Sequence, residues 1–403
     1  MSYKLPTTIV QSGLSEEAPI IQLVSHLLLK AQQSRASDLH LEPLRNGLRV
    51  RFRIDGKLHE IQLLPKKIQN SILSRLKIMT GSMNIAEKRL PQEGRFQIKQ
   101  DRQTLDIRAS TIPTIHGESI VLRLLDRYSR LLELSELGLE KEDCSLLESL
   151  LHQPDGLLLV TGPTGSGKTT TLYACLNVLN TPNCKIITVE DPVEYQIPGI
   201  NQVQIHEKIG RTFPVVLRAM LRQATNKIML GEIRDSETAH IAMNASLTGH
   251  LIFSTLHTND APSAIARLED MGIPLFLIAS GVRAVVAQRL VRRLCSHCKT
   301  PAILTEYERA ALQLPAPSDP NELFMQSVGC SHCHGKGFQG RLGIFEILVF
   351  DEFFRHQVHQ KTTSAQLRYH ARMRGMRTLR DDGLCKMRAG LTTAQEVISM
   401  TLL

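Results

Sequence analysis

A glycine-rich segment, Gly162-Pro-Thr-Gly-Ser-Gly-Lys-Thr169, carries the clearest chemical signal in the chain. It follows the apolar run 157–160 and precedes the helix-compatible run 170–179, which is the context that the pattern GxxxxGK[ST] requires. Glycines let backbone N–H groups curl around phosphate oxygens at a helix N-terminus. We therefore predict an ATP site in which Lys168 reaches the β- and γ-phosphates and Thr169 holds Mg²⁺. The predicted nucleotide-binding residues are Gly162, Pro163, Thr164, Gly165, Ser166, Gly167, Lys168, Thr169 and Thr170.

Three more chemical groups follow short apolar runs that read as buried strands. Glu190, Glu232 and His257 come after the runs 185–189, 227–230 and 251–254. The C-terminal ends of parallel strands meet at one edge of a sheet, which is where ligands bind. We predict that one carboxylate orients or deprotonates water while the other helps to hold the metal. His257 is predicted to sense the γ-phosphate or the water.

These acids also have a structural interpretation, since a carboxylate at a loop-to-helix junction often caps the helix. For Glu194 and Asp235 capping and chemistry are equally good interpretations of the pattern. For Glu232 the position at a predicted strand end favours chemistry.

Two cysteine pairs predict a metal site. Cys295-Ser-His-Cys298 and Cys330-Ser-His-Cys333 are separated by 31 residues and offer four thiolates to a tetrahedral Zn²⁺. With four protein ligands no position is open for water, so we expect a structural role. Two alternatives stay open: four buried thiols without metal, or substitution of one ligand by a neighbouring histidine. The histidines concerned are His297, His332 and His334, and the remaining cysteines (Cys144, Cys175, Cys184 and Cys385) read as ordinary packed thiols.

The elements before the P-loop predict a small α+β domain over residues 16–130, after a flexible lead at 1–15. Apolar spacing indicates helices, and alternation around Asp55-Gly56 indicates a β-hairpin. The expected helices are 18–31 and 68–79, and the expected strands are 48–54, 57–63, 95–99 and 104–109.

Residues 131–403 predict an α/β domain. Strands that are apolar on both faces and alternate with helices imply a buried, mostly parallel sheet. Within this domain we expect a tetracysteine subdomain at 295–346 and C-terminal helices within 347–403, with residues 364–403 helical.

Composition excludes some functional classes. The chain has 403 residues, a net charge of +9, no tryptophan and only 4% aromatic residues, which argues against a base-stacking platform for single-stranded nucleic acid. The apolar run 273–288 is interrupted by Arg283, and the N-terminus has no apolar signal-peptide core. We expect a cytoplasmic protein that binds no nucleic acid directly, with peripheral attachment at the inner face of the cytoplasmic membrane.

Four segments in this order resemble the secretion ATPase superfamily. They are the P-loop, ITVEDPVEY at 187–195, MLGEIRD at 229–235 and STLHTND at 254–260. The N-terminal segments ASDLHLEP at 36–43, RFRIDG at 51–56, PQEGR at 91–95 and DIR at 106–108 are also similar to that family. With its tetracysteine motif the chain resembles the GspE/PilB branch, which drives type II secretion and type IV pilus assembly.

The resemblance implies a RecA-like P-loop ATPase core behind a PAS-like α+β domain, assembled as a homohexamer. It implies that Arg95 and Arg108 close over the phosphates. It also implies that Arg218 and Arg222, predicted to share a helix face within 213–223, reach the neighbouring subunit's nucleotide. An inner-membrane platform protein (GspF/PilC-like) is the implied partner.

Two departures from the family pattern bear on function. Almost nothing precedes residue 16, where the family has a longer docking region, so recruitment by a bitopic membrane protein is in doubt. Ala224-Thr-Asn-Lys227 stands where the family has an acidic Asp-Pro-Asp segment, so metal handling or hydrolysis rate is expected to differ. The second departure favours one alternative, a weakly hydrolysing or regulatory paralogue in such a ring. The positive net charge favours the other, a DNA-uptake motor, against which the scarcity of aromatic residues and the tetracysteine motif argue.

Overall fold

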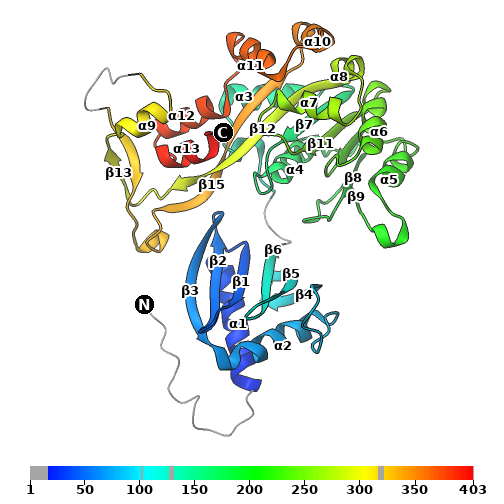
Figure 1. Cartoon of the computed structure of the whole chain (residues 1–403). Coiled ribbons are helices and arrows are strands. Elements are labelled where there is room, and N and C mark those ends of the chain that lie inside the picture. Colours follow the sequence, from blue (N-terminus) through cyan, green and yellow to red (C-terminus); the bar gives the residue numbers. More distant parts are fainter. Residues whose placement is uncertain (1–16, 101–102, 127–130, 316–321, 403) are drawn as a thin grey trace. The chain divides into compact units, whose positions relative to one another are not determined.

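The computed structural model describes residues 17–100, 103–126, 131–315 and 322–402 (Figure 1). The chain divides into two compact units, residues 1–129 and 130–403. Each unit has its own sheet and its own hydrophobic core. The predicted flexible lead at 1–15 lies outside the described residues.

The N-terminal unit is an antiparallel sheet covered by two helices. Its six strands lie in the order β3-β2-β1-β6-β5-β4, and every neighbouring pair is antiparallel. Along β2 buried and half-buried side chains alternate, as expected for a sheet with one covered face. The elements are α1 (Glu17–Gln33), β1 (Asp38–Pro43), β2 (Gly47–Ile54), β3 (Lys57–Pro65), α2 (Gln69–Thr80), β4 (Gln92–Gln100), β5 (Gln103–Thr114) and β6 (Gly117–Asp126).

The predicted hairpin at 48–63 is confirmed, with Ile54 opposite Lys57 across the turn. The predicted helices and the strand pair β4–β5 are also present. Strands β1 and β6 were not predicted, although they form the centre of the sheet. Neither strand shows a long alternation of apolar and polar residues, and β1 carries polar side chains on its outer face.

The second unit is built on a seven-stranded sheet in the order β15-β12-β7-β11-β10-β8-β9. All neighbouring pairs from β12 to β9 are parallel, and β15 runs antiparallel to β12. The predicted α/β class with a mostly parallel sheet is confirmed. The strands are β7 (Gly156–Thr161), β8 (Ile186–Glu190), β9 (Asn201–Gln204), β10 (Lys227–Leu230), β11 (Leu251–Leu256), β12 (Val282–Leu294) and β15 (Phe338–Val349).

The longest strand, β12, was not predicted. Its apolar residues continue directly from helix α8 (Leu275–Gly281), so periodicity alone shows no boundary between helix and strand. Residues on both faces of β12 are buried, because the strand lies between β7 and β15. Its place beside β7 brings residues of β12 close to the P-loop.

Helices pack around this sheet in two groups. The first group precedes or connects the parallel strands and comprises α3 (Lys141–Leu151), α4 (Lys168–Leu179), α5 (Phe213–Met220), α6 (Ser236–Leu247), α7 (Ser263–Asp270) and α8. The C-terminal group comprises α10 (Glu352–His359), α11 (Ser364–Met373), α12 (Leu379–Arg388) and α13 (Ala394–Thr401), of which α12 and α13 contact the β12–β15 pair (Figure 1). Between β12 and β15 lie β13 (Lys299–Ala302), α9 (Glu306–Ala311) and β14 (Phe324–Ser327).

Within the described ranges, every helix is too short or too polar to cross a lipid bilayer.

Candidate nucleotide-binding site

The P-loop joins the C-terminal end of β7 to the first turn of α4. Gly162 and Gly167 have φ angles of +151° and +90°, which favour glycine. Space also requires glycine, since a Cβ on Gly162 would lie 2.5 Å from the carbonyl oxygen of Gln288. The Ser166 hydroxyl is buried and has no hydrogen-bond partner within the described residues. A buried polar atom without a partner at a helix N-terminus fits a site that phosphate completes.

Lys168 is folded back onto this loop. Its Nζ donates to the carbonyl oxygens of Gly162 and Pro163, at 2.8 and 3.1 Å. Burial lowers the pKa of Lys168 to about 8, an effect that Glu232 opposes and Arg289 increases. The two carbonyl groups bring no negative charge to the buried ammonium, so an incoming phosphate oxygen can replace them.

Glu232 and His257 meet at the C-terminal edge of the sheet, as their strand-end positions predict. His257 Nε2 lies 3.3 Å from Glu232 Oε2, and Arg234 Nη2 lies 2.5 Å from Glu232 Oε1. Burial raises the pKa of Glu232, but Arg234 and His257 outweigh this effect and the pKa falls below its ordinary value. The carboxylate is therefore charged at neutral pH, and 21% of its side chain is exposed, so a water molecule can reach it.

Arg234 was not singled out from the sequence, although it bridges two acids at this edge. Besides Glu232 it reaches Asp191, with Nη1 at 3.4 Å from Oδ2. The sequence feature that could have indicated this role is the position of Arg234, two residues after Glu232 in MLGEIRD.

Glu190 is placed differently from Glu232. It is 2% exposed and accepts hydrogen bonds from Tyr173, Thr188 and Gln202. Burial raises the pKa of Glu190 despite these donors. In this arrangement the carboxylate joins α4, β8 and β9, so Glu232 is the better placed of the two for chemistry.

Asp235 has the capping role, which was one of the two interpretations of its position. Its Oδ1 accepts a hydrogen bond from Thr238 N at 2.7 Å at the start of α6.

The segment 224–227 lies at the opposite end of β10 from Glu232. Lys227 begins the strand, and its Nζ donates to the Gln153 carbonyl oxygen at 2.9 Å. Asn226 Oδ1 accepts from Lys185 N at 2.8 Å. Parallel strands bind ligands at their C-terminal ends, so this departure from the acidic family pattern falls on the far edge of the sheet.

Arg218 and Arg222 do not share a full helix. Helix α5 ends at Met220, and Arg222 follows in a turn whose amide donates to Ala219 O at 3.1 Å. The predicted helix over 213–223 is thus too long by three residues, because the last turn tightens to i→i−3 bonds. Arg218 is ion-paired with Glu237, and both side chains are at least half exposed.

The N-terminal unit carries Arg95 and Arg108 in one row across its sheet. Arg95 is opposite Arg108, Arg108 is opposite Arg123, and Arg123 is opposite Asp38. Arg95 is held by the fully buried Asp106, to which its Nε donates at 2.8 Å. Arg123 was missed because β6 was not predicted as a strand.

The four cysteines of the two CxxC pairs converge. Their Sγ atoms lie within 4.8 Å of one another, with Cys295–Cys330, Cys298–Cys333 and Cys330–Cys333 at 3.9, 3.7 and 3.8 Å. Four thiolates around one Zn²⁺, each at about 2.3 Å, have Sγ–Sγ separations of about 3.8 Å. Burial opposes ionisation of Cys333, but the amides of Cys330 and Gly337 lower its pKa to about 6. The residues thus fit a tetrahedral thiolate site.

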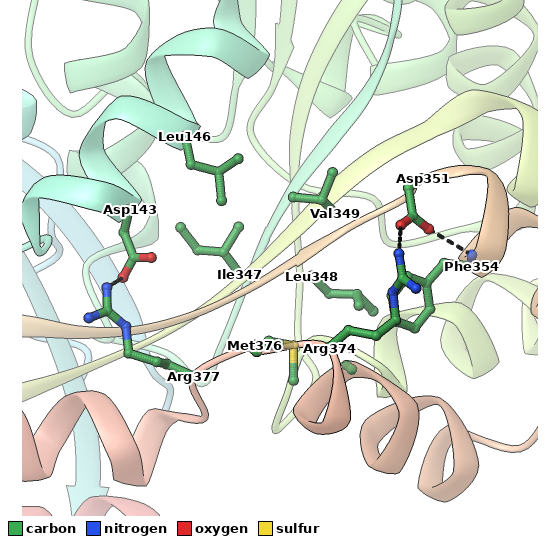
Figure 2. A pocket seen from close by; sticks show the side chains of 12 residues that line it. Asp143, Leu146, Ile347, Leu348, Val349, Asp351, Phe354, Arg374, Met376 and Arg377 are labelled. Atoms are coloured by element: carbon green, nitrogen blue, oxygen red, sulfur yellow. Dashed lines mark hydrogen bonds and ion pairs between the residues drawn. The ribbon is translucent and has the colours of Figure 1, made fainter.

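A separate hollow of about 250 Å³ lies between α3, β15 and the C-terminal helices (Figure 2). Its apolar floor is flanked by two ion pairs, Arg374–Asp351 and Arg377–Asp143, each 2.6 Å long. It contains none of the predicted site residues, and its arginines are already neutralised.

Comparison with known proteins finds a matching family and several relatives. A family model described as type II/IV secretion system protein matches residues 13–399. The type II secretion system protein E of Pseudomonas aeruginosa is 47% identical over 96% of this chain and 76% of its own length. The type IV pilus assembly ATPase PilB of Myxococcus xanthus is 46% identical over 96% of this chain and 69% of its own length.

Solved structures support the fold. The Legionella pneumophila ATPase DotB has a TM-score of 0.69 at 18% identity, covering 94% of this chain and 95% of its own. The pilus retraction motor PilT with bound ADP has a TM-score of 0.62 at 24% identity, covering 93% and 96%. At these identities the likeness concerns the fold alone.

Proposed function

We propose that this chain, which belongs to the type II/IV secretion system protein family, is an ATPase. ATP hydrolysis at its P-loop would power type II secretion or type IV pilus assembly. One observation carries the site assignment: the P-loop lysine, the Glu232 carboxylate and His257 lie at one edge of one sheet. The P-loop amides and Lys168 hold the phosphates, and Thr169 holds Mg²⁺. Glu232 takes a proton from the attacking water, and His257 orients that carboxylate or the γ-phosphate.

Replacing Lys168 by Ala tests the phosphate site. The variant removes the charge that faces the β- and γ-phosphates, so we expect it to lose tight ATP binding. Titration with a fluorescent, non-hydrolysable ATP analogue measures this loss. Lys67→Ala, an exposed lysine of the N-terminal unit, is the matched control and should bind as the wild type does. Normal affinity in the Lys168 variant would refute the assignment.

Nucleotide affinity should depend on pH through Lys168. Its pKa is lowered to about 8 in the free protein, and phosphate favours the charged ammonium and raises that pKa again. Binding therefore takes up a proton, and affinity falls as pH rises above about 8, at most about tenfold per pH unit. Lys168→Arg keeps its charge throughout and should flatten the dependence. Equal slopes in both proteins, measured by calorimetry between about pH 7 and pH 9.5, would contradict this mechanism.

The working form is proposed to be a homohexamer at the inner face of the cytoplasmic membrane. In such a ring Arg218 and Arg222 act on the neighbouring subunit's nucleotide, and an inner-membrane platform protein receives the motion. Arg95 and Arg108 are proposed to stabilise phosphate charge. A bitopic membrane protein is a further candidate partner.

We also propose that Cys295, Cys298, Cys330 and Cys333 bind one structural Zn²⁺ per chain. Metal bound to the folded state stabilises it, and loss of one thiolate removes that contribution. Cys298→Ser should therefore contain less than one tenth of the zinc and unfold at a lower temperature, whereas Cys385→Ser should match the wild type in both. Elemental analysis of protein purified without chelator makes the measurement, and an absence of zinc from the wild type would remove the proposal.

A further inference from the structure

Arg289, in β12, is a buried cation between the P-loop and the loop that carries His257. The residue is 5% exposed. Its Nη2 donates to Asn259 O at 2.8 Å, and its Nη1 donates to Gln288 O at 3.1 Å. A Cβ on Gly162 would lie 3.2 Å from Nη1. The guanidinium therefore lies close to Gly162, the first residue of the P-loop, and donates at its other end to the backbone two residues after His257.

This cation has no ion-pair partner within the described residues. Burial lowers its pKa, and Asp260 and Glu346 oppose that shift only from beyond ion-pair distance. Burying a charge without a direct partner is costly, and an apolar side chain would fill the same space without that cost. The position therefore points to a task that needs the forked guanidinium.

The strand order indicates what this guanidinium does. β7 lies between β12 and β11, so the Arg289 side chain reaches from β12 past the C-terminal end of β7 to the loop after β11. A second hydrogen bond joins that loop to the end of β7, since the Thr258 amide donates to Thr161 Oγ1 at 2.8 Å. The preceding residue of β12, Gln288, accepts from Thr171 Oγ1 of helix α4 at 2.7 Å. Two consecutive residues of β12 thus hold the P-loop helix and the His257 loop.

We propose that Arg289 is a positioning residue for ATP hydrolysis, which fixes the His257 loop against the base of the P-loop. The inference rests on the proposed ATPase function. An arginine suits this place because one Nη donates to the Asn259 carbonyl oxygen of the His257 loop, while the other donates to the Gln288 carbonyl oxygen of its own strand, beside Gly162. A lysine keeps the charge but offers one compact ammonium group, which does not span both carbonyls.

The test is a double-mutant cycle of Arg289→Lys and His257→Ala. Displacement of a catalytic loop by about 1 Å costs up to about 100-fold in rate, so we expect Arg289→Lys to lower kcat by about 10- to 100-fold. Because the P-loop itself stays intact, the Kd for an ATP analogue should stay within about threefold of wild type. Since Arg289 acts through the His257 loop, the double variant should be no more than about twofold slower than His257→Ala alone.

Arg283→Lys is the matched control, because Arg283 lies at the other end of β12 and is ion-paired with Asp155. Arg289→Gln, which keeps an N–H donor without the charge, replaces Arg289→Lys if melting temperature shows that the lysine variant is unfolded. Wild-type kcat in the folded Arg289 variant, or rate losses that multiply in the double variant, would overturn the proposal. An inactive wild type would instead count against the ATPase function itself.

Discussion

Glu232→Gln is expected to bind Mg-ATP nearly as well as the wild type and to hydrolyse it about 10²–10⁴-fold more slowly. That range is the usual contribution of a positioned general base. The amide has nearly the size of the carboxylate and can still form hydrogen bonds with His257 and Arg234. The main change is therefore the loss of the group that accepts the proton of the water. Single-turnover kinetics with a parallel binding measurement separates the two effects.

Two further variants make this result specific. Glu269→Gln alters an exposed acid of α7 and should leave turnover unchanged. Glu190→Gln alters the buried acid and should chiefly lower the melting temperature, since it weakens the network with Tyr173 and Thr188. Turnover of Glu232→Gln within a factor of two of wild type would move the base elsewhere, with Glu190 the next residue to test.

Mixing two inactive variants should restore activity if Arg218 and Arg222 act between subunits. Arginine fingers contribute about 10³–10⁵-fold in rate, so Arg218→Ala/Arg222→Ala alone should be nearly inactive. A Lys168→Ala subunit keeps its arginines, and the double arginine variant keeps its P-loop. Mixed rings therefore contain some interfaces with both parts intact.

The ion pair between Arg218 and Glu237 makes a specific control possible. Glu237→Gln frees Arg218 from its exposed partner, and such pairs contribute little to stability. This variant should therefore keep its activity, and turnover per subunit should rise with protein concentration in both it and the wild type. Mixed rings that assemble but recover no activity would show that the arginines do not act across an interface.

The strand, glycine loop and helix of the proposed phosphate site were predictable because they are consecutive in the sequence. Glu232 and His257 were also predictable, since strand ends in a parallel sheet share an edge. The burial of Glu190 was not predictable, because its donors Tyr173 and Gln202 come from distant segments. Helix α5 ended earlier than predicted, since a tightened last turn has no sequence signature in 213–223.

Arg289 shows the main limit of prediction from one sequence. Its neighbours are set by strand order, and a strand that follows a helix without a polar break is not visible in the apolar pattern. The cysteine pairs were visible from spacing, but only the fold brings the four Sγ atoms within 4.8 Å.

The most direct test of the ATPase function is phosphate release from Mg-ATP by the purified chain, with Lys168→Ala as the blank. We expect steady turnover that rises with protein concentration in the wild type and none above background in the variant. A wild-type rate equal to that of Lys168→Ala at every concentration, in protein shown to be folded and assembled, would contradict the assignment of this chain as an ATP hydrolase.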